Sequence, residues 1–188
     1  MIRTFIAAKV ASTRALCELC DCLQELDKRL HPVSPNDLHV TLKFLGETSE
    51  SQVEPIGAVM RRVVESRPAI QVSLSGLRAF PHAGRPSVVW VGLEPGEPLR
   101  QIAAELDHEL SSLGFEPEHR PFTAHLTLLR VKTRPPEALL AMLAEESQTD
   151  FGLVEFSRVQ LFQSDLTRSG SRYTQLATAV LGEMGSKS

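Results

Sequence analysis

The sequence contains only three cysteines, one tryptophan and one tyrosine, and it has no long apolar run. A membrane-spanning helix needs roughly 18 consecutive apolar residues, and no stretch reaches that length. The N-terminal segment is too short and too interrupted by polar residues to be a secretory signal. Positive charge is not in excess, because 20 Lys and Arg stand against 23 Asp and Glu, a net charge of −3. This balance argues against binding of long duplexes, so any nucleic acid would be recognised at one end or one phosphate.

The three cysteines lie close together, at Cys17, Cys20 and Cys22. A zinc site needs a fourth ligand, usually from a second paired cluster, and the sequence has no such cluster. We therefore expect small residues on a helix rather than metal ligands. An odd number of closely spaced thiols without partners elsewhere fits a reducing cytoplasm.

Hydrophobic residues make up 42% of the 188 residues and charged residues 23%, which is typical of a globular chain. A chain of this length buries roughly 70% of its unfolded surface, enough for one self-sufficient core. We predict a single domain over residues 1–188, with a flexible tail at 182–188.

The order of the predicted elements repeats along the chain. Apolar periodicity predicts a first series of strand, helix, strand, helix and strand at residues 3–8, 16–30, 38–44, 51–64 and 70–80. Ser12 or Thr13 is expected to cap the first helix, and Ser51 to Glu54 to form a capping box for the second. The second series comprises residues 88–91, 99–113, 124–128, 133–143, 151–162 and 173–181.

These two series predict pseudo-repeats at roughly 1–86 and 87–181, related by an approximate two-fold axis. We expect an α+β fold with two lobes, each an antiparallel or mixed sheet with helices on its outer face. The active-site cleft would lie between the lobes.

Corresponding strands of the two series each carry a His-x-Thr motif, at His39–Thr41 and His125–Thr127. Residues i and i+2 of a strand point to the same side, so each histidine shares a face with its threonine. A lone histidine on a strand is usually structural. Two copies on equivalent strands instead indicate one site in which two imidazoles and two hydroxyls converge.

Such a set suits phosphoester chemistry without a metal ion. One imidazole can take a proton from water while the other gives one to the leaving oxygen, since the ordinary histidine pKa is near 6.5. Threonine hydroxyls can donate hydrogen bonds to the non-bridging phosphate oxygens. The other four histidines have no counterpart in the repeat, and we expect them on the surface: His31, His82, His108 and His119.

The segments Leu38–Gly46 and Phe122–Arg130 resemble the two signature motifs of the two-histidine phosphoesterase superfamily. More narrowly, they resemble its RNA 2′,3′-cyclic phosphodiesterases, also known as 2′-5′ RNA ligases. The resemblance covers nearly the whole chain, including residues 3–7, 114–122, 163–166 and 172–173. It implies a bilobal fold and hydrolysis of a 2′,3′-cyclic phosphate to a 2′-phosphomonoester, with no cofactor. It also implies the reverse reaction, in which a 2′-5′ linkage forms.

Carried onto this chain, the resemblance makes His39 the proton donor and His125 the proton acceptor. Thr41, Thr127 and Arg130 would then bind the phosphate. Strict alternation, however, puts Arg130 on the side of the strand opposite His125, so a bulge or the strand end would have to turn it inward.

Other residues near the motifs have two interpretations each. Lys132 and Arg134 could attract an anionic substrate or be merely solvated. An aromatic ring could stack on a base or belong to the core, and this applies to Phe5, Phe44, Trp90 and Tyr173. Alternation places Phe44 with Val40 and Leu42 on the packed side of its strand.

The leading hypothesis is a cytoplasmic, monomeric enzyme acting on RNA with a 2′,3′-cyclic phosphate end, with no membrane and no obligate protein partner. One alternative is a cyclic phosphodiesterase acting on small nucleotides. Another is a non-catalytic module that binds RNA ends.

Overall fold

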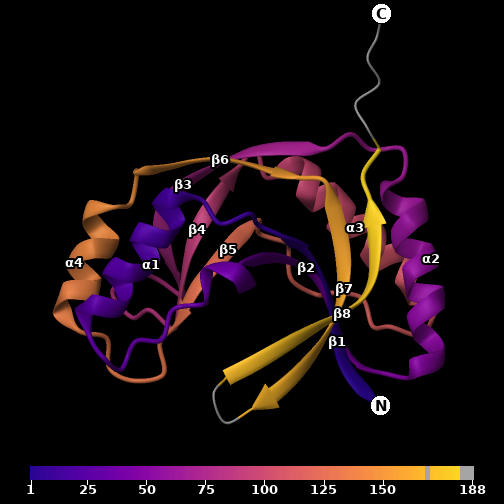
Figure 1. The fold of residues 1–188 in the computed structure, drawn as a ribbon, viewed down its shortest axis with the longest axis horizontal. Helices are drawn as coiled ribbons and strands as arrows, with labels where there is room; N and C mark the ends of the chain where they lie inside the picture. The colour runs from indigo at the N-terminus through magenta and orange to yellow at the C-terminus, as the bar shows by residue number, and fades with distance from the viewer. Residues whose placement is uncertain (168–169, 183–188) are drawn as a thin grey trace, which may run out of the picture.

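The computed structural model describes residues 1–167 and 170–182, which form two four-stranded antiparallel sheets (Figure 1). The first sheet contains, in spatial order, β2 (His39–Thr48), β1 (Ile2–Lys9), β7 (Arg158–Thr167) and β8 (Gly170–Val180). The second contains β5 (His125–Arg130), β4 (Val88–Glu94), β3 (Ile70–Phe80) and β6 (Asp150–Phe156). Every neighbouring pair is antiparallel, which confirms the predicted α+β class.

Four α-helices cover the sheets in two pairs, on opposite sides of the molecule in Figure 1. α2 packs on β7 and β8, and α3 packs on β2 and on α2. α1 packs on β6 and α4 on β3, and these two helices also contact each other. The helices are α1 (Arg14–Leu26), α2 (Val53–Val64), α3 (Glu97–Ser111) and α4 (Glu137–Glu145), with 3₁₀ turns at Pro35–Asp37 and Glu50–Gln52.

Each half of the chain contributes its final strands to the sheet begun by the other half. β3 pairs with β4 and β6, whereas β7 pairs with β1. The single strand predicted over 151–162 is therefore wrong, because the chain leaves one sheet after Phe156 and enters the other at Arg158. The pseudo-repeats at 1–86 and 87–181 stay a prediction, and the tail predicted at 182–188 lies, from residue 183, outside the described residues.

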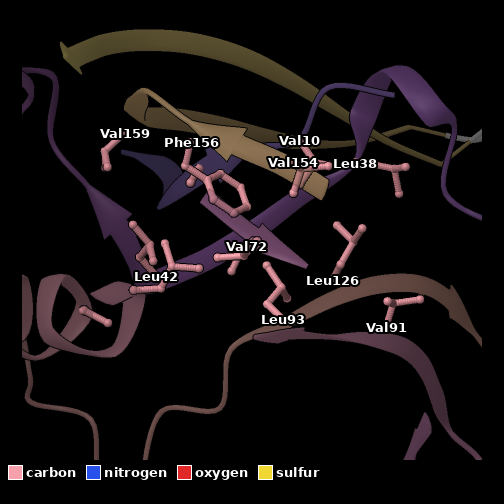
Figure 2. Packing of buried hydrophobic residues seen from close by; sticks show 14 of the residues in the cluster. Val10, Leu38, Leu42, Val72, Val91, Leu93, Leu126, Val154, Phe156 and Val159 are labelled. Atoms are coloured by element: carbon pink, nitrogen blue, oxygen red, sulfur yellow. The ribbon is translucent and has the colours of Figure 1, made fainter. Parts of the chain in front are cut away.

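This exchange gives the two sheets a shared core. One apolar cluster contains buried residues from both sheets and all four helices. Figure 2 shows members of it from different sheets, such as Leu42 of β2 and Leu93 of β4. A second, small cluster of Phe5, Ala7 and Phe162 is separate from the first, and Tyr173 packs against it.

The helix starts agree with the sequence in one case and differ in another. Thr13 caps α1, since the Leu16 N–H donates to its Oγ1 at 3.2 Å. The capping box predicted at 51–54 is wrong, because it is formed by Ser49 and Gln52, where the Ser49 N–H donates to the Gln52 Oε1 at 2.9 Å. A 3₁₀ turn precedes α2 and displaces the box toward the N-terminus.

Cys17, Cys20 and Cys22 all lie on α1 as predicted, and all three are free. Burial raises the pKa of the Cys20 thiol to about 11, and the neighbouring charges at Cys17 and Asp21 act in the same direction. The thiol is therefore protonated at neutral pH and chemically quiet, because the thiolate is the reactive form.

Candidate active site

The two His-x-Thr motifs lie on β2 and β5, the edge strands of the two sheets, and these strands contact each other. A pocket of about 440 Å³ opens between them. Four of the predicted site residues line it: Thr41, His125, Thr127 and Arg130. His39 does not line this pocket, but it is close enough to Arg130 for the guanidinium charge to act on its imidazole.

A bulge turns Arg130 into the pocket. Along β5 the pairing with β4 steps from Thr127 directly to Leu129, so Leu128 is an extra residue. Leu128 and Leu129 are consequently both buried, and Arg130 returns to the side of His125. The Leu128 carbonyl, which the ladder leaves free, accepts a hydrogen bond from the Val33 N–H at 2.7 Å.

β2 carries the same irregularity at the same place in its motif. Its pairing with β1 steps from Thr41 to Lys43, so Leu42 is the extra residue. Leu42 and Lys43 are both buried, and Phe44 lines the pocket with 59% of its surface exposed. The prediction that Phe44 packs with the buried residues of the strand is therefore wrong, and Phe44 is the counterpart of Arg130.

Both histidines are oriented by a backbone carbonyl two residues upstream. Nδ1 of His39 bonds to the Asp37 carbonyl at 2.7 Å, and Nδ1 of His125 to the Thr123 carbonyl at 2.7 Å. A carbonyl can only accept, so Nδ1 carries a proton in each ring. Nε2 is then the nitrogen free to exchange a proton with a substrate.

Pairs of aromatic rings flank each imidazole. The His39 ring lies 5.1 Å from Phe5 and 5.2 Å from Tyr173. In the other lobe the His125 ring lies 5.4 Å from Phe80 and 5.8 Å from Trp90. These rings restrict how each imidazole can turn.

Phe80 and Phe162 also stack on another ring of the site, and sequence analysis missed the role of both. Phe162 stacks on Phe5 at 5.5 Å, and Phe80 stacks on Trp90 at 4.7 Å. The available signal was that Phe80 and Phe162 are each the last residue of a predicted strand, 70–80 and 151–162. They also follow His39 and His125, respectively, at comparable distances along the sequence.

The surroundings of His39 lower its pKa. Burial is the largest cause, and the nearby charges of Arg130 and Lys9 act in the same direction. The hydrogen bond to the Asp37 carbonyl and the charge of Asp37 oppose the shift without cancelling it. A bound phosphate would supply negative charge and favour the protonated ring again.

A buried ion pair anchors the segment that leads to His125. Lys43, whose side chain is 1% exposed, donates to the Asp107 Oδ1 at 2.5 Å and to the Glu116 carbonyl at 2.9 Å. Asp107 also accepts from the Glu118 N–H at 2.9 Å. These bonds join β2, α3 and the segment carrying Thr123, whose carbonyl orients His125. The only sequence signal was a lysine within an apolar strand.

The other four histidines are exposed, as predicted. Within residues 1–167 and 170–182, no group of three or more His, Cys, Asp or Glu side chains is placed to hold a metal ion. Over the same residues, none of the helices is both long and apolar enough to cross a membrane.

Comparison with known proteins finds related sequences and the same fold elsewhere. The sequence profile of the 2′-5′ RNA ligase superfamily matches residues 7–168. An RNA 2′,3′-cyclic phosphodiesterase of Aeropyrum pernix is 39% identical over 163 residues, which cover 86% of this chain and 92% of that protein. The RNA 2′,3′-cyclic phosphodiesterase of Thermotoga maritima is 32% identical over 180 residues, covering 93% of both chains.

Solved structures share the fold over nearly the full length. The crystal structure of TT0787 of Thermus thermophilus superposes with a TM-score of 0.75 at 26% identity, covering 97% of this chain and all of that one. LigT of Escherichia coli superposes with a TM-score of 0.74 at 24% identity, over 96% and 98% of the two chains. With paired His-x-Thr strands, one shared pocket and this extent of similarity, the chain belongs to the 2′-5′ RNA ligase superfamily.

Proposed function

We propose that this protein hydrolyses the 2′,3′-cyclic phosphate at the 3′ end of RNA to a 2′-phosphomonoester. The observation that carries the proposal is the convergence of Thr41, His125, Thr127 and Arg130 on one pocket beside His39. Relatives with up to 39% identity bear the name RNA 2′,3′-cyclic phosphodiesterase, which supports the same activity. The reaction takes place on RNA ends in the cytoplasm, and the protein acts as a monomer without an obligate partner.

In the proposed mechanism the two imidazoles move one proton each. His125 accepts a proton from water through Nε2 as the water oxygen bonds to phosphorus. The bond between phosphorus and the 3′ oxygen breaks, and His39 protonates that oxygen. Thr41, Thr127 and Arg130 donate hydrogen bonds to the non-bridging oxygens, where negative charge accumulates in the transition state. With a 5′-hydroxyl end in place of water as the nucleophile, the same groups form a 2′-5′ linkage. The 5′ oxygen bonds to phosphorus as it gives its proton to His125, the bond between phosphorus and the 3′ oxygen breaks, and His39 protonates that oxygen.

The proposal is tested by incubating the purified protein with an oligoribonucleotide that ends in a 2′,3′-cyclic phosphate. Conversion of the end to a 2′-phosphate supports the proposal, and an unchanged end overturns it. Binding without conversion would instead favour the alternative of a non-catalytic RNA-end module. A nucleoside 2′,3′-cyclic phosphate tested in parallel shows whether small nucleotides are also substrates.

The pH dependence should reveal which histidine is the acid. The pKa of His39 is lowered, so a His39 that must be protonated loses its proton as pH rises through a value below the ordinary 6.5 or so. The pH profile of kcat/KM reports the free enzyme. We therefore expect kcat/KM to decrease as the pH rises, with the midpoint of this alkaline limb below about pH 6.5. Arg130→Gln should move that limb upward, since the guanidinium charge helps to lower the pKa.

The measurement is kcat/KM against pH for the wild type and Arg130→Gln. If activity instead falls only as pH drops through the lowered pKa, His39 is the base and the assigned roles are reversed. If the alkaline limb does not move in Arg130→Gln, that limb does not report the titration of His39.

Phe44 is the residue we propose to stack on the base next to the cyclic phosphate. Phe5 and Trp90 are buried and Tyr173 packs against His39, whereas Phe44 is exposed at the pocket. Base–aromatic stacking contributes roughly 1–3 kcal/mol, so Phe44→Ala should raise KM about 5- to 100-fold with little change in kcat. Leu153→Ala, which truncates an apolar side chain that is 71% exposed on β6, is the matched control. An unchanged KM in Phe44→Ala would show that the base lies elsewhere.

A further inference from the structure

Two large hollows flank the catalytic pocket, and they differ in charge. One, of about 800 Å³, adjoins the pocket through Phe44, Glu118 and Arg120. Its charged and titratable lining consists of the three carboxylates of Glu47, Glu116 and Glu118, together with Arg120, His119 and the N-terminal residue Met1. The other, of about 760 Å³, lies between the loops 81–87 and 131–137. Its charged lining consists of Arg85, Lys132, Arg134 and the single carboxylate Glu137, together with His82.

The cations of the second hollow are available to a partner. Arg85, Lys132 and Arg134 are all exposed. Across the described residues, none of these three is found in an ion pair, whereas all four arginines of α1, α2 and α3 are paired. In a chain with a net charge of −3, this is a local concentration of positive charge. We call the two loops 81–87 and 131–137, with their cations Arg85, Lys132 and Arg134, the basic loop pair.

The basic loop pair is continuous with the active site. One loop begins directly after Phe80, whose ring contacts His125, and the other directly after Arg130. Hydrogen bonds hold the loops together where they leave the site. The Ser87 N–H donates to the Phe80 carbonyl at 2.7 Å, and the Val131 N–H donates to the Ser87 carbonyl at 2.9 Å.

We propose that the basic loop pair binds backbone phosphates of the single-stranded RNA upstream of the cyclic end. This inference rests on the proposed function and extends it from the terminal phosphate to the body of the substrate. The cyclic phosphate occupies the 3′ end, so the remaining strand must leave the pocket in its 5′ direction. The strand passes Arg130 onto the two loops, because a polyanion is attracted there and repelled by the carboxylates of the other hollow.

The test compares two substrates and two double variants. Arg85→Ala with Arg134→Ala removes one cation from each loop, and Arg61→Ala with Arg62→Ala removes two exposed arginines from the outer face of α2 as the matched control. The substrates are a single-stranded oligoribonucleotide ending in a 2′,3′-cyclic phosphate and a nucleoside 2′,3′-cyclic phosphate. Turnover of the nucleoside also reports that the catalytic pocket of each variant is intact.

We expect the loop variant to lose roughly tenfold or more in kcat/KM on the oligoribonucleotide at low salt. The kcat/KM of the loop variant on the nucleoside 2′,3′-cyclic phosphate should stay within about twofold of the wild-type value. The control variant should stay within about twofold of wild type on both substrates. In wild type, log affinity for the oligoribonucleotide should fall with log salt, and the loop variant should reduce that slope by roughly 0.7 for each cation removed.

Equal losses on both substrates, no loss on either, or an equal loss in the control variant would overturn the proposal. An unchanged result on both substrates is also what a different acidic partner for these loops would give. If wild-type protein converts neither substrate, the proposed function itself fails, and that result is distinct from the others. The salt slope of the wild type provides a check that depends on no substitution.

Discussion

His125→Ala should lower turnover by roughly 10²–10⁴-fold while leaving the fold intact, and His39→Ala should do the same. In the proposed mechanism, each substitution removes a group that moves one of the two protons. In that mechanism Thr41, Thr127 and Arg130 would still hold the phosphate, so we expect the loss mainly in kcat. The fold should tolerate both changes, because neither imidazole belongs to the shared apolar core and the His125 ring lines the pocket.

The double variant gives a sharper test of the pair. If the two imidazoles act in one step, removing the second costs little once the first is gone, and the losses do not multiply. The measurement is single-turnover hydrolysis of a cyclic-phosphate-terminated oligoribonucleotide by both single variants and the double variant. His108→Ala, an exposed histidine on α3, is the control and should retain full activity. Near-wild-type turnover in either single variant would contradict the assignment of the pair.

Asp107→Ala should destabilise the protein by about 3–5 kcal/mol, because it leaves the buried ammonium of Lys43 without a counter-charge. Lys43→Met should cost less. It removes the buried charge itself with a side chain of similar length, and the Asp107 carboxylate left behind is 23% exposed and can be solvated. The two variants thus break the same bond but should differ in the free energy of unfolding.

The pair should also contribute to the pH dependence of stability. Burial acts to raise the pKa of Asp107, but hydrogen bonds from Lys43 and from the Glu118 N–H outweigh it and the net shift is downward. A carboxyl whose folded pKa is below its unfolded value stabilises the fold above the ordinary pKa of about 3.9. That contribution is lost as the pH falls through the lower folded value.

Urea unfolding of wild type, Asp107→Ala and Lys43→Met at neutral and acidic pH measures both effects. Asp107→Glu, which keeps the charge, serves as the matched variant and should recover part of the lost stability. A Lys43→Met variant as unstable as Asp107→Ala would show that the bonds, and not the unpaired buried charge, dominate. The free energy difference between wild type and Asp107→Ala should shrink in acid, where the carboxylate is protonated.

Several features of the site could be predicted from sequence because they depend on local patterns. The His-x-Thr spacing places His39 with Thr41 and His125 with Thr127, since alternation along a strand is a local property. The same periodicity was enough to predict the α+β class and most of the helices and strands. The need for a bulge before Arg130 followed from the same rule, because a phosphate contact at that position conflicts with alternation.

Other features depend on partners that are distant in sequence. Phe44 reaches the pocket only because the pairing of β2 with β1 skips Leu42, and the buried charge of Lys43 is compensated by Asp107 on α3. The break between β6 and β7 is likewise set by which sheet offers each strand a free edge. Thus local order along the chain determined the residue types of the candidate site and their spacing, whereas strand register, the twin bulges and the exchange between sheets were decided by long-range backbone pairing. Such pairing forms only when segments distant in sequence meet, so periodicity within one segment carries no record of it.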